Sequence, residues 1–269
     1  MEAVILEKVP GTGVAKIILN RPERRNAMNA QLVDDFMKAL EEIRADREIN
    51  AVITKGAGPV YSSGLDLYYL RAQSEGPPAD WDKFSPTAIM FEAVRNFPKV
   101  TIAQVHGYCL GGALALMNSH DLVIAANDVQ IGMPEILRGS FGQMATSTLF
   151  HAGLPMKKAA LIQLLGRNLT GSEADKLGLV SMAVEPGELE NITMKIAQEI
   201  ASRHPGVLSC AKIAVQMGRN MPLADAMRLD QLVASRQRLM VDPLGKVEEY
   251  LQSQKGGPNV GYKRSDSQS

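Results

Sequence analysis

Two glycine-containing segments carry the residue types that could bind an oxyanion. The first is Ser62–Asp66, which reads Ser-Ser-Gly-Leu-Asp, and the second is His106–Ala113, which reads His-Gly-Tyr-Cys-Leu-Gly-Gly-Ala. Glycine at a helix start lets a ligand oxygen approach unpaired backbone N–H groups, where the helix dipole is positive. Either segment alone is a weak signal, because paired glycines also serve tight helix–sheet packing. Two N–H groups aimed at one point would stabilise the oxygen of an enolate.

A carboxylate follows these segments at Glu135. It stands in Met133–Ile136, which reads Met-Pro-Glu-Ile, after a strand predicted at 129–132. Apolar neighbours exclude water from a carboxylate, and this raises its pKa toward the range that suits proton transfer near neutral pH. A surface acid that begins a helical turn after a proline is the alternative. The residue alone leaves both interpretations open.

Alternating strands and helices would position these groups. Strands are predicted at 4–6, 14–19, 51–54 and 101–105, with a hairpin turn at 11–13. Asn29 can cap a helix whose apolar residues repeat at helical spacing as far as Ile43, and another helix is predicted at 86–95. Helices that alternate with strands are typical of a parallel sheet covered by helices.

The second half of the chain has a helical pattern. Helices are predicted at 156–165, 172–178, 191–202, 207–218, 223–240 and 243–254, and the tail at 256–269 is polar. The segment Arg71–Ser85 breaks every period and is predicted to be a loop, which either shapes a pocket or lies plainly on the surface. We therefore expect a core at residues 1–203 and a helical region at 204–269, which would pack on the core and on another subunit.

Composition excludes several classes of function. The chain has 269 residues, 45% of them hydrophobic, and its 29 basic residues balance its 29 acidic ones. A net charge of zero provides no overall field that would attract nucleic acid or an anionic membrane. Two cysteines are too few for a disulfide scaffold and lack metal-ligand spacing. We see no signal peptide and no spanning segment, so a cytoplasmic location is expected.

Taken together and in this order, the three segments resemble the crotonase (enoyl-CoA hydratase/isomerase) superfamily. The similarity extends from Leu19–Met28, which reads Leu-Asn-Arg-Pro-Glu-Arg-Arg-Asn-Ala-Met, to the C-terminal helices. The resemblance implies an α/β fold with a ββα spiral core and a helical C-terminal layer. It also implies an acyl-CoA substrate, with coenzyme A as part of the substrate, no bound cofactor and no metal. A homotrimer or a dimer of trimers is the implied assembly.

The resemblance also implies roles for individual residues. The backbone N–H groups of Ser63 and Gly112 would form an oxyanion hole for the thioester carbonyl, and Glu135 would be the catalytic acid and base. Further contacts with the substrate or its coenzyme A are implied for Arg25, Ala27, Gly64, Leu65, Asp66, Tyr69, Gly111 and Gln143.

One departure from the family pattern affects the expected reaction. Ala115 occupies the position where the family's hydratases have a first catalytic glutamate, and Gly139–Ala145 replaces their glycine-rich turn. One carboxylate beside an oxyanion hole resembles the enoyl-CoA isomerases, so movement of a double bond through an enolate is the leading expectation. The alternatives are a single-glutamate hydratase or hydratase-lyase, an acyl-CoA hydrolase, and a non-catalytic acyl-CoA-binding or scaffold protein.

Overall fold

The computed structural model describes residues 2–74, 83–241, 248 and 251–252. It divides into two compact units, Met1–Leu208 and Ser209–Ser269, whereas the sequence suggested a boundary after residue 203. The predicted polar tail, and most of the predicted helix at 243–254, lie outside the described residues.

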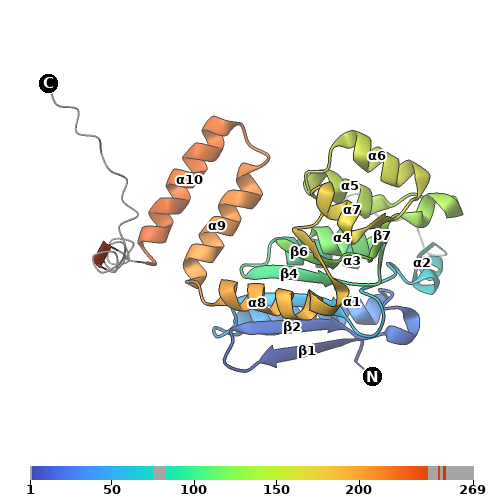
Figure 1. Cartoon of the computed structure of the whole chain (residues 1–269), viewed down its shortest axis with the longest axis horizontal. Coiled ribbons are helices and arrows are strands. Elements are labelled where there is room, and N and C mark those ends of the chain that lie inside the picture. The colour runs from blue at the N-terminus through green and yellow to red at the C-terminus, as the bar shows by residue number, and fades with distance from the viewer. Residues whose placement is uncertain (1, 75–82, 242–247, 249–250, 253–269) are drawn as a thin grey trace. The chain divides into compact units, whose positions relative to one another are not determined.

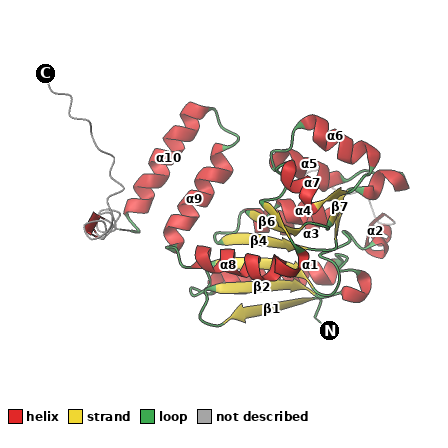
Figure 2. Ribbon diagram, in the orientation of Figure 1, coloured by secondary structure: helices red, strands yellow, loops and turns green. Residues whose placement is uncertain are grey.

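A mostly parallel sheet forms the centre of the first unit (Figures 1 and 2). In spatial order its strands are β1 (Val4–Val9), β2 (Val14–Leu19), β3 (Ala51–Gly56), β4 (Val100–Val105), β6 (Leu122–Ala126) and β9 (Met182–Val184). β1 pairs antiparallel with β2, and the remaining neighbours are parallel. Most apolar residues of the central strands β2, β3 and β4 are buried, as expected for a sheet with helices on its faces, whereas Ile5 on the edge strand β1 is exposed.

A second, smaller sheet explains how distant functional segments meet. Its strands are β5 (Tyr108–Leu110), β7 (Gln130–Gly132) and β8 (Leu169–Thr170), and β5 lies parallel to β7 with Leu110 opposite Gly132. β5 leads into α4 (Gly112–Asn118), and β7 leads into the 3-10 helix η2 (Pro134–Arg138), which carries Glu135. Because neighbouring parallel strands end at the same edge, the glycine pair and the glutamate emerge side by side.

Local sequence signals account for several helices. The Asn29 side chain accepts a hydrogen bond from the Leu32 N–H at 3.0 Å and begins α1 (Ala30–Ala45). Ser85 caps α3 (Pro86–Arg95) in the same way. α1 packs on β1 and β2, and α8 (Leu189–Ala201) crosses β2, β3, β4 and β6.

The remaining helices are η1 (Pro22–Arg24), α2 (Leu67–Ser74), α5 (Gln143–His151), α6 (Met156–Leu165), α7 (Gly171–Lys176), η3 (Pro186–Glu188), α9 (Pro205–Gly218) and α10 (Leu223–Arg238). Among them, α6, α9 and α10 were predicted with similar bounds. The predicted loop at 71–85 is wrong in its first four residues, which continue α2; residues 75–82 lie outside the described residues. α7 begins earlier than predicted, because Thr170 and Glu173 form a capping box.

A charged network ties α8 to the sheet. Glu190 accepts hydrogen bonds from Lys16 at 2.9 Å, from Gln104 at 2.8 Å and from Lys55. Burial alone would raise the pKa of Glu190, but these contacts outweigh it and lower the pKa to about 2. A pKa below its unfolded value stabilises the fold above the unfolded pKa, and this stabilisation is lost as the pH falls toward about 2.

Replacing this glutamate should therefore change stability in a pH-dependent way. About half of the Glu190 side chain is exposed, so water screens its contacts, and we expect Glu190→Gln to cost on the order of 1 kcal/mol at pH 7. Urea unfolding at pH 7 and pH 3 would measure a cost that shrinks with acid. Glu23→Gln, at an exposed position, is the control. A cost that is the same at both pH values would contradict the prediction.

Candidate functional site

The main-chain contact between Met28 and Leu65 determines which amide faces the site. Met28 N–H donates to Gly64 O at 2.8 Å, and Asp66 N–H donates to Met28 O at 2.9 Å. The Gly64 carbonyl and the Asp66 N–H, which flank Leu65, are thus both paired with Met28. The Leu65 N–H itself donates no hydrogen bond within the described residues. Backbone donors are rarely left unpaired where water has limited access, so this amide is a candidate ligand contact.

Ser63 does not provide the free amide that the sequence suggested. Its N–H donates to Arg25 O at 2.9 Å, which contradicts the prediction that Ser63 is an oxyanion donor. The unpaired amide of this segment is that of Leu65, which was predicted only as a substrate contact.

Gly112 places a second amide beside Leu65. It is the first residue of α4, so its N–H lacks an intrahelical acceptor, and none is found in the part of the chain that the structure describes. A Cβ built on Gly64 would lie 3.2 Å from Gly112 N and 2.5 Å from Leu110 O, and one built on Gly112 would lie 3.1 Å from Leu65 Cγ. Gly64, at φ +96°, therefore permits this close approach of the two segments.

Glu135 completes the cluster. The Gly111 N–H donates to Gly132 O at 2.9 Å, which holds the start of α4 against the strand before Glu135. A Cβ on Gly111 would overlap Glu135 Oε1, so the carboxylate packs directly on the Gly111 backbone. The other oxygen, Oε2, is buried and has no hydrogen-bond partner among the described residues. Burial raises the pKa of Glu135, and its own backbone amide and Arg138 oppose this only partly.

The contact between Gly111 and the carboxylate yields a prediction. Gly111→Ala should push the Glu135 carboxylate out of place and lower kcat by about a hundredfold, the typical effect of a misplacement of about 1 Å. Gly111 also has φ +55°, so Gly178→Ala is the matched control: φ is +72° there, and its added Cβ would meet no atom within 4 Å. Steady-state kinetics and thermal unfolding check the pair. Normal turnover in Gly111→Ala would show that the carboxylate position is irrelevant.

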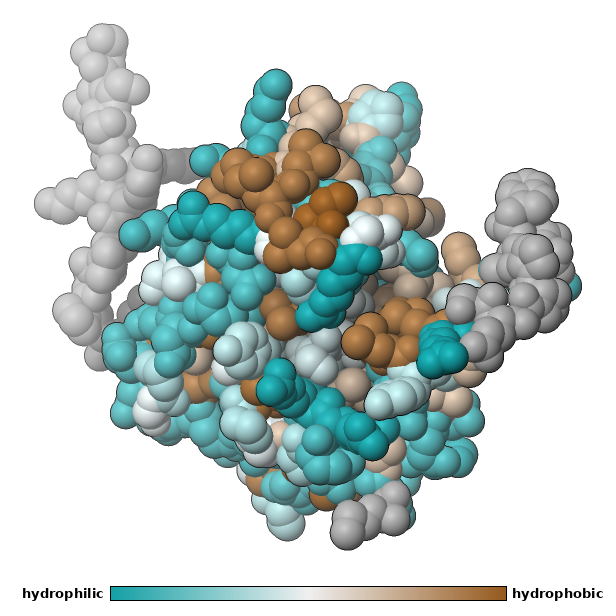
Figure 3. Space-filling model, turned by 90° about the vertical axis from the view of Figure 1, so that its right-hand side faces the viewer, coloured by the Kyte–Doolittle hydropathy of each residue, from teal (hydrophilic) through white to brown (hydrophobic). Residues whose placement is uncertain are grey.

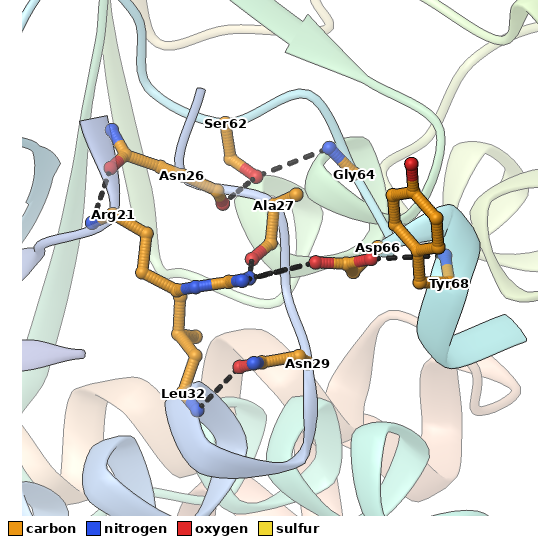
Figure 4. A network of polar contacts seen from close by, with 9 residues as sticks. All are labelled: Arg21, Asn26, Ala27, Asn29, Leu32, Ser62, Gly64, Asp66 and Tyr68. Carbon is orange, nitrogen blue, oxygen red and sulfur yellow. Dashed lines mark hydrogen bonds and ion pairs between the residues drawn. The ribbon is translucent and has the colours of Figure 1, made fainter. Parts of the chain in front are cut away.

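Two predicted substrate contacts are engaged within the protein instead. Asp66 accepts hydrogen bonds from the Arg21 guanidinium at 3.1 Å and from the Tyr68 N–H at 3.0 Å (Figure 4). The second of these bonds lies at the start of α2. The Ala27 carbonyl accepts from Arg21, and its N–H donates to Arg24 O at 3.1 Å. The structure therefore shows both residues in contacts within the protein, and their contacts with substrate stay predictions.

The remaining predicted residues lie around the cluster without joining it. Arg25 is exposed, Tyr69 is half-buried on α2, and Gln143 is exposed at the start of α5. Neither Tyr69 nor Gln143 donates to the Glu135 carboxylate in the described part of the chain. Ala115, where a second carboxylate was sought, is fully buried among apolar neighbours on α4. The described residues contain no group of three or more His, Cys, Asp or Glu suited to a metal ion.

Apolar surface extends from the cluster. Figure 3 shows hydrophobic side chains gathered on the side of the molecule that bears α2, α5 and α6. The exposed apolar residues of these elements and of η2 with its following loop are Leu67, Tyr68, Leu70, Ile136, Leu137, Phe141, Phe150, Met156, Leu161, Leu164 and Leu165. Leu67 and Tyr68 follow Leu65 closely in the chain, and Ile136 and Leu137 follow Glu135, so apolar side chains border the cluster. No helix in the described part is long and apolar enough to cross a membrane.

Known proteins share this architecture. The family model described as "Enoyl-CoA hydratase/isomerase" matches residues 10–238. Hydroxycinnamoyl-CoA hydratase-lyase of Pseudomonas fluorescens is 30% identical over 74% of each chain. Enoyl-CoA hydratase domain-containing protein 2, mitochondrial, of Bos taurus is 31% identical over 86% of this chain and 80% of its own. The crystal structure of enoyl-CoA hydratase from Mycobacterium smegmatis superposes with a TM-score of 0.86, at 22% identity, over 94% of this chain and 97% of that chain.

Proposed function

The chain belongs to the enoyl-CoA hydratase/isomerase family and is an acyl-CoA enzyme of that family, and we propose that it adds water to a 2-enoyl-CoA. One observation carries the proposal: the unpaired amides of Leu65 and Gly112 lie beside a half-buried glutamate with an unpartnered oxygen. The predicted fold class, an α/β core of this family with C-terminal helices, is confirmed by the superposition.

The reaction would use one carboxylate twice. The thioester oxygen accepts hydrogen bonds from Leu65 and Gly112, and it takes up negative charge as water adds to C3. Glu135 accepts the proton from that water and then donates it to C2, which neutralises the enolate. A raised pKa suits both roles, because the acid and the base are then accessible near neutral pH. Two fixed donors typically stabilise such an oxyanion by ~3–4 kcal/mol each.

Hydration is preferred to the isomerisation expected from the sequence. The relatives above are named hydratase and hydratase-lyase, not isomerase. In a hydratase-lyase the same glutamate would next take the proton of the 3-hydroxyl group. The C2–C3 bond then breaks, its electron pair forms the thioester enolate as an aldehyde leaves, and the glutamate returns the proton to C2 to give the shortened acyl-CoA. The oxyanion hole serves both steps, so the two activities can share one site.

Incubation in deuterium oxide distinguishes the possible reactions. With a 2-enoyl-CoA we expect 3-hydroxyacyl-CoA that carries deuterium at C2; an aryl-substituted substrate would also give an aldehyde and acetyl-CoA if the enzyme is a hydratase-lyase. Conversion of 3-enoyl-CoA to 2-enoyl-CoA without hydration would instead establish an isomerase, and release of free CoA a hydrolase. Binding of acyl-CoA without any turnover would support a scaffold protein and contradict the proposal.

Two further expectations belong to this proposal. Arg25 is exposed near the site and would contact a phosphate of coenzyme A.

A homotrimer or a dimer of trimers is proposed because α9 and α10 expose large apolar side chains, among them Val215, Leu223, Met227 and Leu232. Light scattering would give the mass of the assembly, and a monomer at micromolar concentration would contradict this part.

A further inference from the structure

An arginine that was not among the predicted site residues bridges the two segments that meet at Met28 and Leu65. The side chain of Arg21 lies between two segments and is 16% exposed. Its guanidinium donates to Asp66 Oδ2 through both Nη1 and Nη2 at 3.1 Å, and Nη1 also donates to Ala27 O (Figure 4). Ala27 immediately precedes Met28, and Asp66 immediately follows Leu65. The guanidinium therefore closes on the Met28–Leu65 contact that orients the Leu65 amide.

The segment that supplies Met28 needs such support, because its backbone is strained. Arg25 and Asn26 are consecutive residues with φ of +52° and +53°, a region that side chains such as that of Arg25 rarely adopt, whereas asparagine tolerates it. The buried Asn26 side chain holds the turn: it accepts from Arg21 N–H at 2.9 Å and donates to Ala57 O and Val60 O at 2.9 and 2.8 Å. Arg21 thus acts on this turn through both its backbone and its side chain.

A second link joins the same two segments. The Ser62 hydroxyl donates to Asn26 O at 2.8 Å and accepts from the Gly64 N–H at 3.2 Å. The position of Leu65 is therefore determined by contacts on both sides, and the Arg21–Asp66 pair is the only charged one among those described here. Burial alone would raise the pKa of Asp66, but hydrogen bonds from Arg21 and from the Tyr68 and Tyr69 amides lower it, so the pair stays charged at neutral pH.

We propose that Arg21 is a positioning residue for catalysis: its planar guanidinium, bridging Ala27 and Asp66, aims the Leu65 amide at the thioester oxygen. This rests on the proposed oxyanion hole. A lysine keeps the charge but presents a single point donor on a flexible chain, so it cannot reproduce the fork that contacts both residues. Arg21→Lys should therefore misdirect the amide while the ionic character of the pair is retained.

Kinetics and binding separate positioning from simple loss of structure. We expect Arg21→Lys to lower kcat about tenfold or more, because a misaligned oxyanion donor loses much of its effect. The Kd for free coenzyme A, which has no thioester carbonyl, should stay within about twofold of the parent. Asp66→Asn, which keeps an acceptor for the Tyr68 N–H, should likewise lower kcat and leave the Kd for free coenzyme A unchanged. Arg203→Lys makes the same substitution in an exposed pair with Glu199 and is the matched control, with unchanged kcat.

A spectroscopic readout tests the geometry itself. A 2-enoyl-CoA labelled with 13C at the thioester carbonyl would be bound to the folded protein in the Glu135→Gln background, where turnover is blocked. Compared with the free substrate, its carbonyl resonance should move downfield when it binds the Glu135→Gln protein, which is the parent here. At least half of this movement should be lost when Arg21→Lys or Asp66→Asn is added to that parent. No downfield movement in the parent would overturn the proposed oxyanion hole. Full movement in both the parent and the added variants would overturn the role of Arg21 alone. If Arg21→Lys does not fold, Asp66→Asn decides.

Discussion

Replacing Gly112 by proline is expected to lower kcat by about a hundredfold or more, because proline removes one of the two N–H groups that stabilise the enolate. The substitution is otherwise mild for the backbone. Gly112 is the first residue of α4, where proline is well tolerated and no helical hydrogen bond is lost. The variant therefore removes a donor while the helix is kept.

Gly112→Ala is the matched control for the proline variant. A Cβ at this position would lie 3.1 Å from Leu65 Cγ and 3.2 Å from Met28 Cε, so both variants add crowding against the ends of flexible side chains. Only alanine keeps the N–H. The ratio of kcat between the two variants, measured with circular dichroism on each, isolates the donor. Equal kcat values in two folded variants would contradict the assignment of Gly112.

Glu135→Gln should lower kcat by about a hundred- to ten-thousandfold, the usual range for a positioned acid or base. Glutamine has nearly the same shape, so the packing on Gly111 is kept while proton transfer is lost. Acyl-CoA binding should change little, because the oxyanion donors belong to other residues. The wild-type profile of kcat against pH should also show one group that titrates above the ordinary range of a glutamate, since burial raises the pKa of Glu135.

Hydration assays and binding measurements on the same preparation check this prediction. Loss of turnover with intact acyl-CoA binding is the expected result, and the pH profile of the residual activity should lose the group assigned to Glu135. A folded Glu135→Gln variant that retains more than about a tenth of wild-type kcat would assign proton transfer to another residue.

Periodicity and capping signals in the sequence predicted the elements that form the main sheet and its cover. Two elements show why the prediction succeeded. β2 at Val14–Leu19 and α3 at Pro86–Arg95 have the predicted bounds, because an apolar strand pattern and a capping serine are local features of the sequence. Of the small sheet only β7 was predicted, within the strand expected at 129–132. β5 and β8 have three and two residues, too few for an alternation to stand out.

The segments predicted for the site lie together in the structure, but the Ser63 N–H that was predicted as a donor is already paired. The sequence identified Ser62–Asp66, the glycine pair and Glu135, because glycines and an isolated acid after a strand are local signals. It could not show which N–H of the first segment is free, because that depends on Arg25 and Met28, more than thirty residues away. The Arg21–Asp66 pair joins residues that are 45 positions apart, and no local pattern reports such a contact.

A crystal structure of the Glu135→Gln variant with a bound 2-enoyl-CoA would test the central claim most directly. The thioester oxygen should lie about 2.7–3.1 Å from both the Leu65 and the Gly112 nitrogen atoms, with the side chain at position 135 against C2 and C3. A thioester oxygen bound at the Ser63 amide, or held by neither Leu65 nor Gly112, would contradict the account.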